Sequence, residues 1–155
     1  MAATEDNRFV LAWERYLYNG SNSLDDIFIA VYQNTGSLIT GPTQITTPTP
    51  GYYEYNSDPN LTSLQGNRAF LTWTYYNQGY QNIRYTVLDS SGAQLFSPGW
   101  ITSGSNWNSH PDVVQLTKGN IIVAWLDYYS NEPEIAYEVL NSGYSVINGP
   151  ITLPN

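Results

Sequence analysis

The 155-residue chain has no cysteine, few charged residues and no long hydrophobic run. Without cysteine it can form neither a disulfide nor a thiolate metal site. Charged residues make up 12% of the chain, against about a quarter in ordinary domains. Five Lys and Arg stand against 13 Asp and Glu, which gives a net charge of −8. Because nucleic acids and anionic membranes are bound through clustered basic side chains, we expect neither as a partner.

The N-terminal sequence MAATEDNR has no apolar core of a signal peptide. No apolar segment approaches the roughly 20 residues that a membrane-spanning helix needs. The composition, which is poor in Lys and rich in Tyr, Asn and Thr, suits an extracellular or cell-surface protein. It does not decide the compartment.

One pattern recurs three times along the chain. Trp13, Trp73 and Trp125 end the apolar segments RFVLAW, RAFLTW and IIVAW. Each is followed by a segment that ends at a glycine, namely DIFIAVYQNTG, NIRYTVLDSSG and EIAYEVLNSG. Each copy closes with a Gly/Pro pair and Ile-Thr. A repeat of about fifty residues indicates a repeat architecture.

The recurring segments have the properties of strands. They are short, rich in β-branched and aromatic residues, and bounded by Gly, Asn, Ser or Pro. The sequences NTGS, SSGA and NSGY between them predict tight turns in which Gly supplies the positive φ. No segment has a sustained helical period, so we predict an all-β fold.

The order P-x-V-x-x-L, G-N-x-x-V-A-W, I-x-Y-x-V-L and Gly-Pro-Ile-Thr resembles β-propeller blades of repeat-rich bacterial proteins. The resemblance implies four-stranded antiparallel blades in one domain: blade 1 at about 5–50, blade 2 at about 57–103 and blade 3 at about 109–155. Pro59 and Pro111 would open the innermost strands of the second and third copies. The first copy has no counterpart, so we expect it to lack its inner strand. Trp13, Trp73 and Trp125 are expected to pack between blades.

Three blades are too few for a ring, since propellers use about four to eight. An open array would expose apolar sheet faces at both ends. We therefore predict a homo-oligomer, with a six-bladed dimer favoured over a trimer. The alternative is a chain cut from a longer propeller.

Side chains that depart from the repeat are the candidate ligand contacts, because packing does not require them. By the propeller resemblance, their loops surround the mouth of the central channel, where aromatic rings beside polar groups suit a sugar. The tentative ligand residues are Tyr53, Tyr55, Asp58, Tyr75, Trp107, His110 and Tyr128. The same loops contain Tyr16, Tyr18, Tyr52, Tyr76, Tyr80, Asp127 and Tyr129. Alternatively, these side chains stiffen the loops or contact another subunit.

The segment NSDPN at 56–60 resembles the N-D-P-N of invertase-type five-bladed glycosidases, whose Asp is the nucleophile. Ser57 replaces the Asn of that motif, and the motif of the partner acid is missing. A glycosidase needs two carboxylates about 5–10 Å apart, for which Asp58 and Asp112 are the candidates. His110, the single histidine, replaces Asp58 in the repeat and is more typical of a turn than of a catalytic base.

The adjacent carboxylates of Asp25 and Asp26 could bind calcium, which takes oxygen ligands. No D-x-D-x-D-G loop surrounds them, so we expect a solvated loop. No cofactor, metal or catalytic residue is predicted. The leading interpretation is a non-enzymatic propeller module that self-assembles and binds a ligand, with carbohydrate favoured over a protein. The alternatives are a glycosidase that uses Asp58 and a purely structural building block, either a fragment or an engineered chain.

Overall fold

A computed structural model describes residues 1–18, 23–47, 53–128 and 132–153 of the chain. These residues form strands and turns, with no helix among them. The described part of the chain accordingly has no helix long and apolar enough to cross a membrane.

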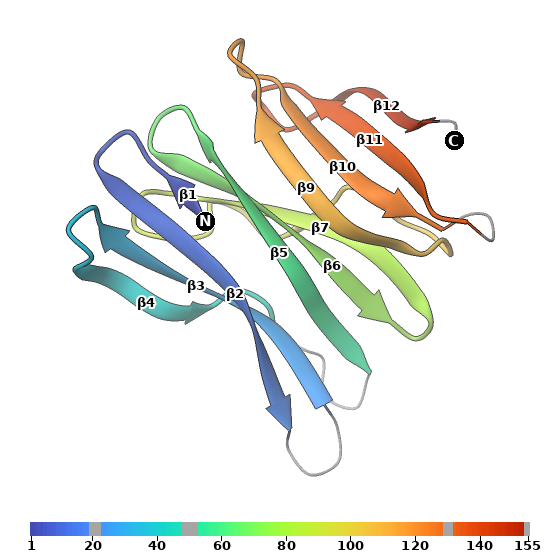
Figure 1. Cartoon of the computed structure of the whole chain (residues 1–155), viewed down its shortest axis with the longest axis horizontal. Helices are drawn as coiled ribbons and strands as arrows, with labels where there is room; N and C mark the ends of the chain where they lie inside the picture. The colour runs from blue at the N-terminus through green and yellow to red at the C-terminus, as the bar shows by residue number, and fades with distance from the viewer. Residues whose placement is uncertain (19–22, 48–52, 129–131, 154–155) are drawn as a thin grey trace.

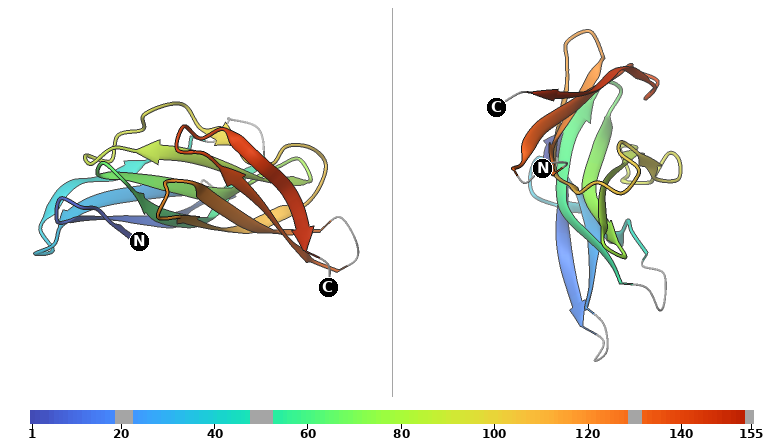
Figure 2. Two further views of the ribbon diagram at one scale, coloured as in Figure 1. Left: turned by 90° about the horizontal axis from the view of Figure 1, so that it is seen from above. Right: turned by 90° about the vertical axis from the view of Figure 1, so that its right-hand side faces the viewer.

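The strands form one eight-stranded sheet, β1 to β8, and one four-stranded sheet, β9 to β12. Within the larger sheet a single parallel bridge joins two antiparallel units, so the chain has three four-stranded units, called blades 1 to 3 below (Figure 1). Blade 1 contains β1 (Ala2–Ala3), β2 (Arg8–Tyr18), β3 (Ser23–Gln33) and β4 (Leu38–Gln44). Blade 2 contains β5 (Glu54–Leu64), β6 (Arg68–Asn77), β7 (Tyr80–Leu88) and β8 (Gly99–Trp100). Blade 3 contains β9 (Asn108–Gln115), β10 (Ile121–Asp127), β11 (Glu134–Leu140) and β12 (Val146–Leu153). Figure 2 shows blade 2 between the other two, so each end blade turns one face away from the chain.

The inner position of blade 1 is occupied by only two residues. Ala2 and Ala3 pair with Val10 and Phe9 of β2. In blade 2 the equivalent pairs are formed by Thr62 and Ser63 at the end of the full inner strand β5. The first copy therefore lacks a full-length inner strand, as predicted, but β1 occupies two positions near the end of that strand.

Neighbouring blades are joined in the same way at both junctions. Asp25 in the third strand of blade 1 forms a parallel bridge with Tyr55 of blade 2. Gln81 in the third strand of blade 2 forms the same bridge with Trp107, just before blade 3. This recurrence makes the residues of successive blades equivalent in space as well as in sequence.

Two hydrophobic cores lie between the blades. Trp73, Leu71 and Ile29 belong to the first core, between blades 1 and 2. Trp125 and Phe70 belong to the second, between blades 2 and 3. Alternate residues of each strand face opposite sides, so one strand of blade 2 serves both cores. One face of blade 2 packs on blade 1 and the opposite face packs on blade 3. The two junctions are therefore repeats of the same interface.

Trp13 occupies the equivalent place on the outward face of blade 1. It is half-buried, and its ring stacks on Phe28 at a centroid distance of 6.1 Å. Trp73 and Trp125, which have a blade on that side, are 0% and 3% exposed.

Candidate functional site

Asp58 and His110 occupy equivalent places on the inner strands of blades 2 and 3. Each precedes a proline and lies at a shift in the strand register. Both have left-handed backbones, with φ values of 52° and 53°. Non-glycine residues seldom adopt this conformation, and a bulge of this kind redirects a side chain out of the regular alternation. The repeat therefore re-aims both side chains by the same local distortion.

The two side chains meet through Thr74 of β6. The Thr74 hydroxyl donates to Asp58 Oδ2 over 3.1 Å and accepts from the His110 backbone N–H over 3.1 Å. His110 Nε2 lies 4.0 Å from Asp58 Oδ1, and the two side chains are 63% and 37% exposed. Ser57 also donates to Asp58, over 3.3 Å. This cluster is polar, oriented and open to solvent.

Glu14 repeats the role of Thr74 one blade earlier, because each is the residue after the recurring Trp. The Glu14 carboxylate accepts a hydrogen bond from the backbone N–H of Asp58. Burial raises the pKa of Glu14, and the charges of Asp25 and Asp58 raise it further. Burial also raises the pKa of Asp25. Glu14, Asp25, Asp58, Thr74 and His110 are called the inner-strand site below.

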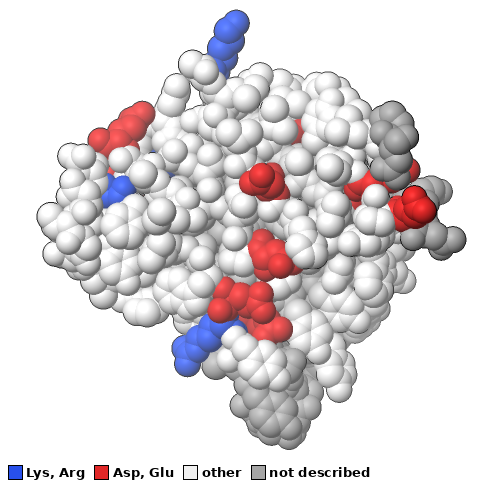
Figure 3. All heavy atoms as spheres, in the orientation of Figure 1, with Lys and Arg blue, Asp and Glu red and all other residues white. Residues whose placement is uncertain are grey.

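The face of the molecule seen in Figure 3 has more acidic than basic side chains. Figure 3 shows acidic side chains in a row over the middle strands, with basic side chains only at the lower end and the rim. Among the described residues, Arg8 and Asp6 form an ion pair at 3.2 Å, and His110 lies 4.0 Å from Asp58. Neutral or cationic ligands are therefore electrostatically better suited to this face than anionic ones.

Asp25 and Asp26 lie in strand β3, so the expected solvated loop was wrong. Asp26 is 1% exposed and accepts hydrogen bonds from Thr46 Oγ1 and Gln44 Nε2, each over 2.9 Å. Burial raises its pKa. Asp26 fastens the last strand of blade 1 to its neighbour, whereas Asp25 contributes to the inner-strand site.

Asp58 and Asp112, the two carboxylates that the sequence suggested as a pair, do not occupy equivalent positions on their inner strands. The structure brings His110 to Asp58, because His110 occupies the equivalent bulge position. Asp112 lines a small depression with Val114 and Ile122, on the outward face of blade 3. The described residues also contain no group of three or more His, Cys, Asp or Glu side chains that could hold a metal ion.

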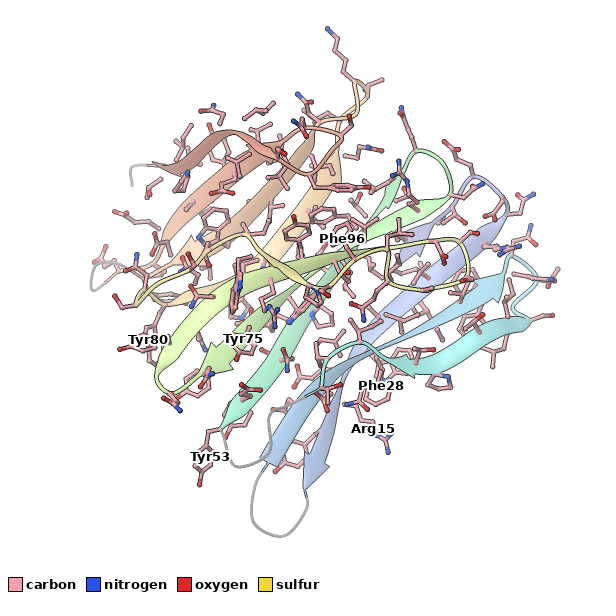
Figure 4. The ribbon with its side chains drawn as sticks, turned by 180° about the vertical axis from the view of Figure 1, so that it is seen from behind. Arg15, Phe28, Tyr53, Tyr75, Tyr80 and Phe96 are labelled. Carbon is pink, nitrogen blue, oxygen red and sulfur yellow. The ribbon has the colours of Figure 1, made fainter. Side chains whose placement is uncertain are left out.

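Those predicted aromatic residues that the structure describes lie in several separate places. Tyr55 packs against Tyr76 at a centroid distance of 5.4 Å. Trp107 is 48% exposed and lies beside Tyr128, whose backbone N–H donates to the Trp107 carbonyl over 2.9 Å. Tyr53 is 59% exposed and lies just before the first residue of β5 (Figure 4). The side chains of Tyr18, Tyr52 and Tyr129 lie outside the described residues.

Tyr75 faces the space between blades 1 and 2. Its hydroxyl donates to Glu54 Oε1 over 2.9 Å, and its ring meets Trp100 edge-on at 5.4 Å. It lines a pocket of about 250 Å³. A pocket of about 260 Å³ lies at the equivalent place between blades 2 and 3. The first pocket is lined by Ile45, Thr46, Trp73, Tyr75, Arg84 and Pro98, and the second by Ile101, Thr102, Trp125, Asp127, Glu138 and Pro150.

Reasoning from the sequence found Asp58 and His110 but missed Glu14 and Thr74. Both follow the repeated Trp directly, at a position where blade 3 has Leu126. The signal was therefore present, as a polar residue at a fixed place in two copies. It could not be interpreted without knowing that this place faces the bulge of the next blade.

Solved structures of glycoside hydrolases have a similar fold. An endo-arabinase from Bacteroides thetaiotaomicron is 18% identical, with a TM-score of 0.57 over 97% of this chain and 59% of that chain. A GH32 β-fructofuranosidase of Bombyx mori is 12% identical, with a TM-score of 0.58 over 95% of this chain and 35% of that chain. A mutant of this enzyme in complex with sucrose is 11% identical, with a TM-score of 0.60 over 98% and 36%.

The similarity shows the fold alone. The neighbours are β-propeller glycosidases, so the prediction of an all-β chain made of propeller blades is confirmed. The chain spans less than two thirds of the length of each neighbour. The sequence matches no protein-family model and no curated protein.

Proposed function

We propose that the inner-strand site binds a neutral carbohydrate. The proposal rests on one observation: Asp58 and His110 are re-aimed by equivalent bulges to within 4.0 Å of each other on an open face. Carboxylates accept hydrogen bonds from sugar hydroxyls, and an imidazole can donate to or accept from them. Tyr16, which pairs with Asp25 and is 62% exposed, offers a ring beside these groups.

Two further observations support this ligand class. The row of acidic side chains disfavours acidic sugars and other polyanions. The neighbours of similar fold are, by name, an arabinase and a fructofuranosidase. Arabinan and fructan fragments are therefore the first ligands to test.

Isothermal titration with arabino- and fructo-oligosaccharides tests the proposal. Asp58→Asn keeps the shape of the side chain but removes the charged acceptor, so affinity should fall about tenfold, as for the loss of a charge-assisted hydrogen bond. Glu5→Gln is the matched control, because Glu5 is exposed in the turn between β1 and β2. Equal affinities of wild type and Asp58→Asn, or no binding of any neutral oligosaccharide, would contradict the proposal.

Hydrolysis is a second candidate function, favoured by the contact of Glu14 with Asp58. A glycosidase combines a protonated acid with an ionised carboxylate. The raised pKa of Glu14 suits the acid, and the two hydroxyl donors to Asp58 suit the carboxylate. Reducing ends released from arabinan or fructan, and lost in both Glu14→Gln and Asp58→Asn, would establish it. Binding without release would leave carbohydrate binding as the function.

We further propose that the two outward faces bind each other in a second copy of the chain. Ile27, Ile83 and Ile135 are equivalent: the first two are 0% exposed against the next blade, and Ile135 is 50% exposed. Blade 1 presents the other half of this interface, where Trp13 stacks on Phe28 and Arg15 covers the Phe28 ring at 5.2 Å (Figure 4). The outward face of blade 3 is thus equivalent to the faces by which blades 1 and 2 contact the next blade. The outward face of blade 1 is equivalent to the faces by which blades 2 and 3 contact the preceding blade.

Light scattering measures this assembly directly. We expect a mass of two copies, whereas a stable species of 17.4 kDa would contradict the proposal. Ile135→Asp should dissociate the assembly, because a buried unpaired charge is costly at an apolar interface. Thr117→Asp, in an exposed turn of the same blade, should leave the mass unchanged.

A further inference from the structure

The pocket between blades 2 and 3 contains buried polar atoms without partners. Glu138 is 5% exposed and Trp125 is 3% exposed, and both line the pocket together with Asp127. Among the described residues, nothing hydrogen-bonds to Glu138 Oε2, Asp127 Oδ1 or Trp125 Nε1. Buried polar groups in native proteins are nearly always satisfied. The pocket therefore offers a bound molecule three polar atoms with unused hydrogen-bonding capacity.

The equivalent pocket between blades 1 and 2 contains a cation supplied by the chain itself. The Arg84 guanidinium lies 4.5 Å from the centre of the Trp100 ring and 5.3 Å from that of Tyr75. It donates to the Pro98 carbonyl over 3.1 Å. In the first pocket, Trp73 Nε1 also has a partner, since it donates to Asn56 Oδ1 over 2.9 Å.

The register of the strands identifies what replaces this cation in the second pocket. Arg84 pairs with Trp73, and Ala136 pairs with Trp125, so Ala136 is the equivalent of Arg84. By the same register Asp127 takes the place of Tyr75, and Glu138 takes the place of Thr86. The second pocket has thus lost the Arg84 guanidinium and the Glu54 carboxylate, which Ala136 and Asn106 replace, and has gained two carboxylates. Neither carboxylate belongs to an ion pair among the described residues.

We infer that the pocket between blades 2 and 3 binds a small organic cation, an ammonium or guanidinium group with a hydrogen-bond acceptor next to the charge. The cation would lie where Arg84 lies in the first pocket and would be held by Asp127 and Glu138. The acceptor would receive the hydrogen bond of Trp125 Nε1–H. This site is separate from the inner-strand site, so the inference does not depend on the proposed carbohydrate binding.

The chemistry favours a cation over a neutral polyol. A buried carboxylate without a partner is costly, and a paired cation removes that cost, whereas a hydroxyl offers a weaker charge-assisted bond. The Trp125 indole ring that lines the pocket also attracts cations. A volume of about 260 Å³ corresponds to that of roughly nine water molecules in the liquid. The pocket therefore accepts one sugar-sized group at most, and an amino sugar combines the required charge with hydroxyl acceptors.

Glucosamine and glucose form a matched pair of probes, since they differ chiefly in the cationic amine. The reporter is the indole Nε1–H signal of Trp125 in the NMR spectrum, identified as the signal that disappears in Trp125→Phe. We expect a saturable shift with glucosamine in the millimolar range, and one at least about tenfold weaker with glucose at the same ionic strength. Methylguanidinium, which mimics the end of Arg84, tests the charge without the sugar ring.

Two variants test the assignment of the groups. Glu138→Gln keeps the size but removes the charge and should weaken glucosamine binding by about tenfold or more. Ala136→Arg places a guanidinium in the pocket as in blade 2 and should abolish binding. Glu5→Gln, in an exposed turn of blade 1, should bind as the wild type does. If either variant fails to fold, the other decides by the same measurement.

The inference is overturned by any of three results. One is the absence of a saturable shift with both glucosamine and methylguanidinium. Another is an equal affinity for glucose and glucosamine, which would identify a hydroxyl site. The third is undiminished glucosamine binding by the folded Glu138→Gln or Ala136→Arg protein.

Discussion

The junction between blades 1 and 2 and the junction between blades 2 and 3 use the same repeat positions with different side chains. In the first, Trp73 donates to Asn56, and Arg84 fills the space beside the rings of Tyr75 and Trp100. In the second, Trp125 has no hydrogen-bond partner among the described residues, and the place of Arg84 is taken by Ala136. Packing of the Trp is retained, while the polar lining has changed.

The turn between the last two strands of each blade also has different residues at equivalent positions. Gly92 of blade 2 comes so close to blade 1 that a Cβ there would lie 2.7 Å from Ile29 Cδ1. Tyr144 holds the equivalent place in blade 3 with a φ of 68°, and its ring packs on Phe70 and Phe96. At the junction of blades 1 and 2 the Gly92 backbone packs directly on the neighbouring blade, whereas at the junction of blades 2 and 3 the Tyr144 ring makes the contact. The repeat thus specifies where the blades meet, and individual residues determine how.

Gly92→Ala should have the largest effect on this comparison. The left-handed φ of +86° and the contacts with buried Ile29 and Val31 together should cost about 2–4 kcal/mol of unfolding free energy. Gly36, in the equivalent turn of blade 1, has the same φ but nothing within 4 Å of its Cβ position. Gly36→Ala should therefore cost only about 1 kcal/mol. Urea unfolding of both variants measures the difference, and equal losses would show that blade contact is unimportant here.

Trp73→Phe and Trp125→Phe test the role of the hydrogen bond. Both lose part of a buried ring, but only Trp73→Phe leaves Asn56 Oδ1 without its donor. Asn56 is 3% exposed, so this loss should make Trp73→Phe about 1–2 kcal/mol more destabilising than Trp125→Phe. Chemical denaturation of the two variants gives the difference. A greater loss in Trp125→Phe would mean that the indole N–H in the second junction is paired.

Arg84→Ala converts the lining of the first junction to that of the second. Loss of the stacking on Trp100 and of the bond to the Pro98 carbonyl should cost about 1 kcal/mol, because removal of the buried charge offsets part of the effect. Burial lowers the pKa of Arg84, in keeping with this desolvation. A fall in Tm together with a change in Trp fluorescence would confirm the prediction. An unchanged Tm would show that the cation does not stabilise the junction.

Glu138→Gln should give the smallest effect, seen only in the pH dependence of stability. Burial raises the pKa of Glu138 above its usual value of 4.5, so the folded chain binds a proton more tightly than the unfolded chain. Its contribution is present below pH 4.5 and is lost as the pH rises through the folded-state pKa. Glu138→Gln should remove this pH-dependent fall in unfolding free energy. The unfolding free energy of the variant should therefore rise relative to that of the wild type as the pH approaches neutral. Parallel curves of unfolding free energy against pH would contradict it.

The sequence allowed the fold to be predicted because the evidence for it is local and repeated. β-branched segments, turn glycines and the recurring Trp-centred pattern report backbone preferences and burial, which depend on near neighbours. Only part of the candidate site could be predicted from the sequence. Asp58 and His110 departed from a repeated position before a proline, whereas Glu14 and Thr74 could be assigned a role only once the facing bulge of the next blade was known.

The sequence by itself determined an all-β chain of three blades, the reduced inner strand of the first, and a negative charge that disfavours polyanions. Only the tertiary structure decided that His110 meets Asp58, that Tyr75 faces a blade junction, and that Ala136 stands where Arg84 lies one blade earlier. The reason is physical. Strand formation depends on alternation along one segment, but a site depends on which faces of separate strands are brought together, and a single bulge changes that.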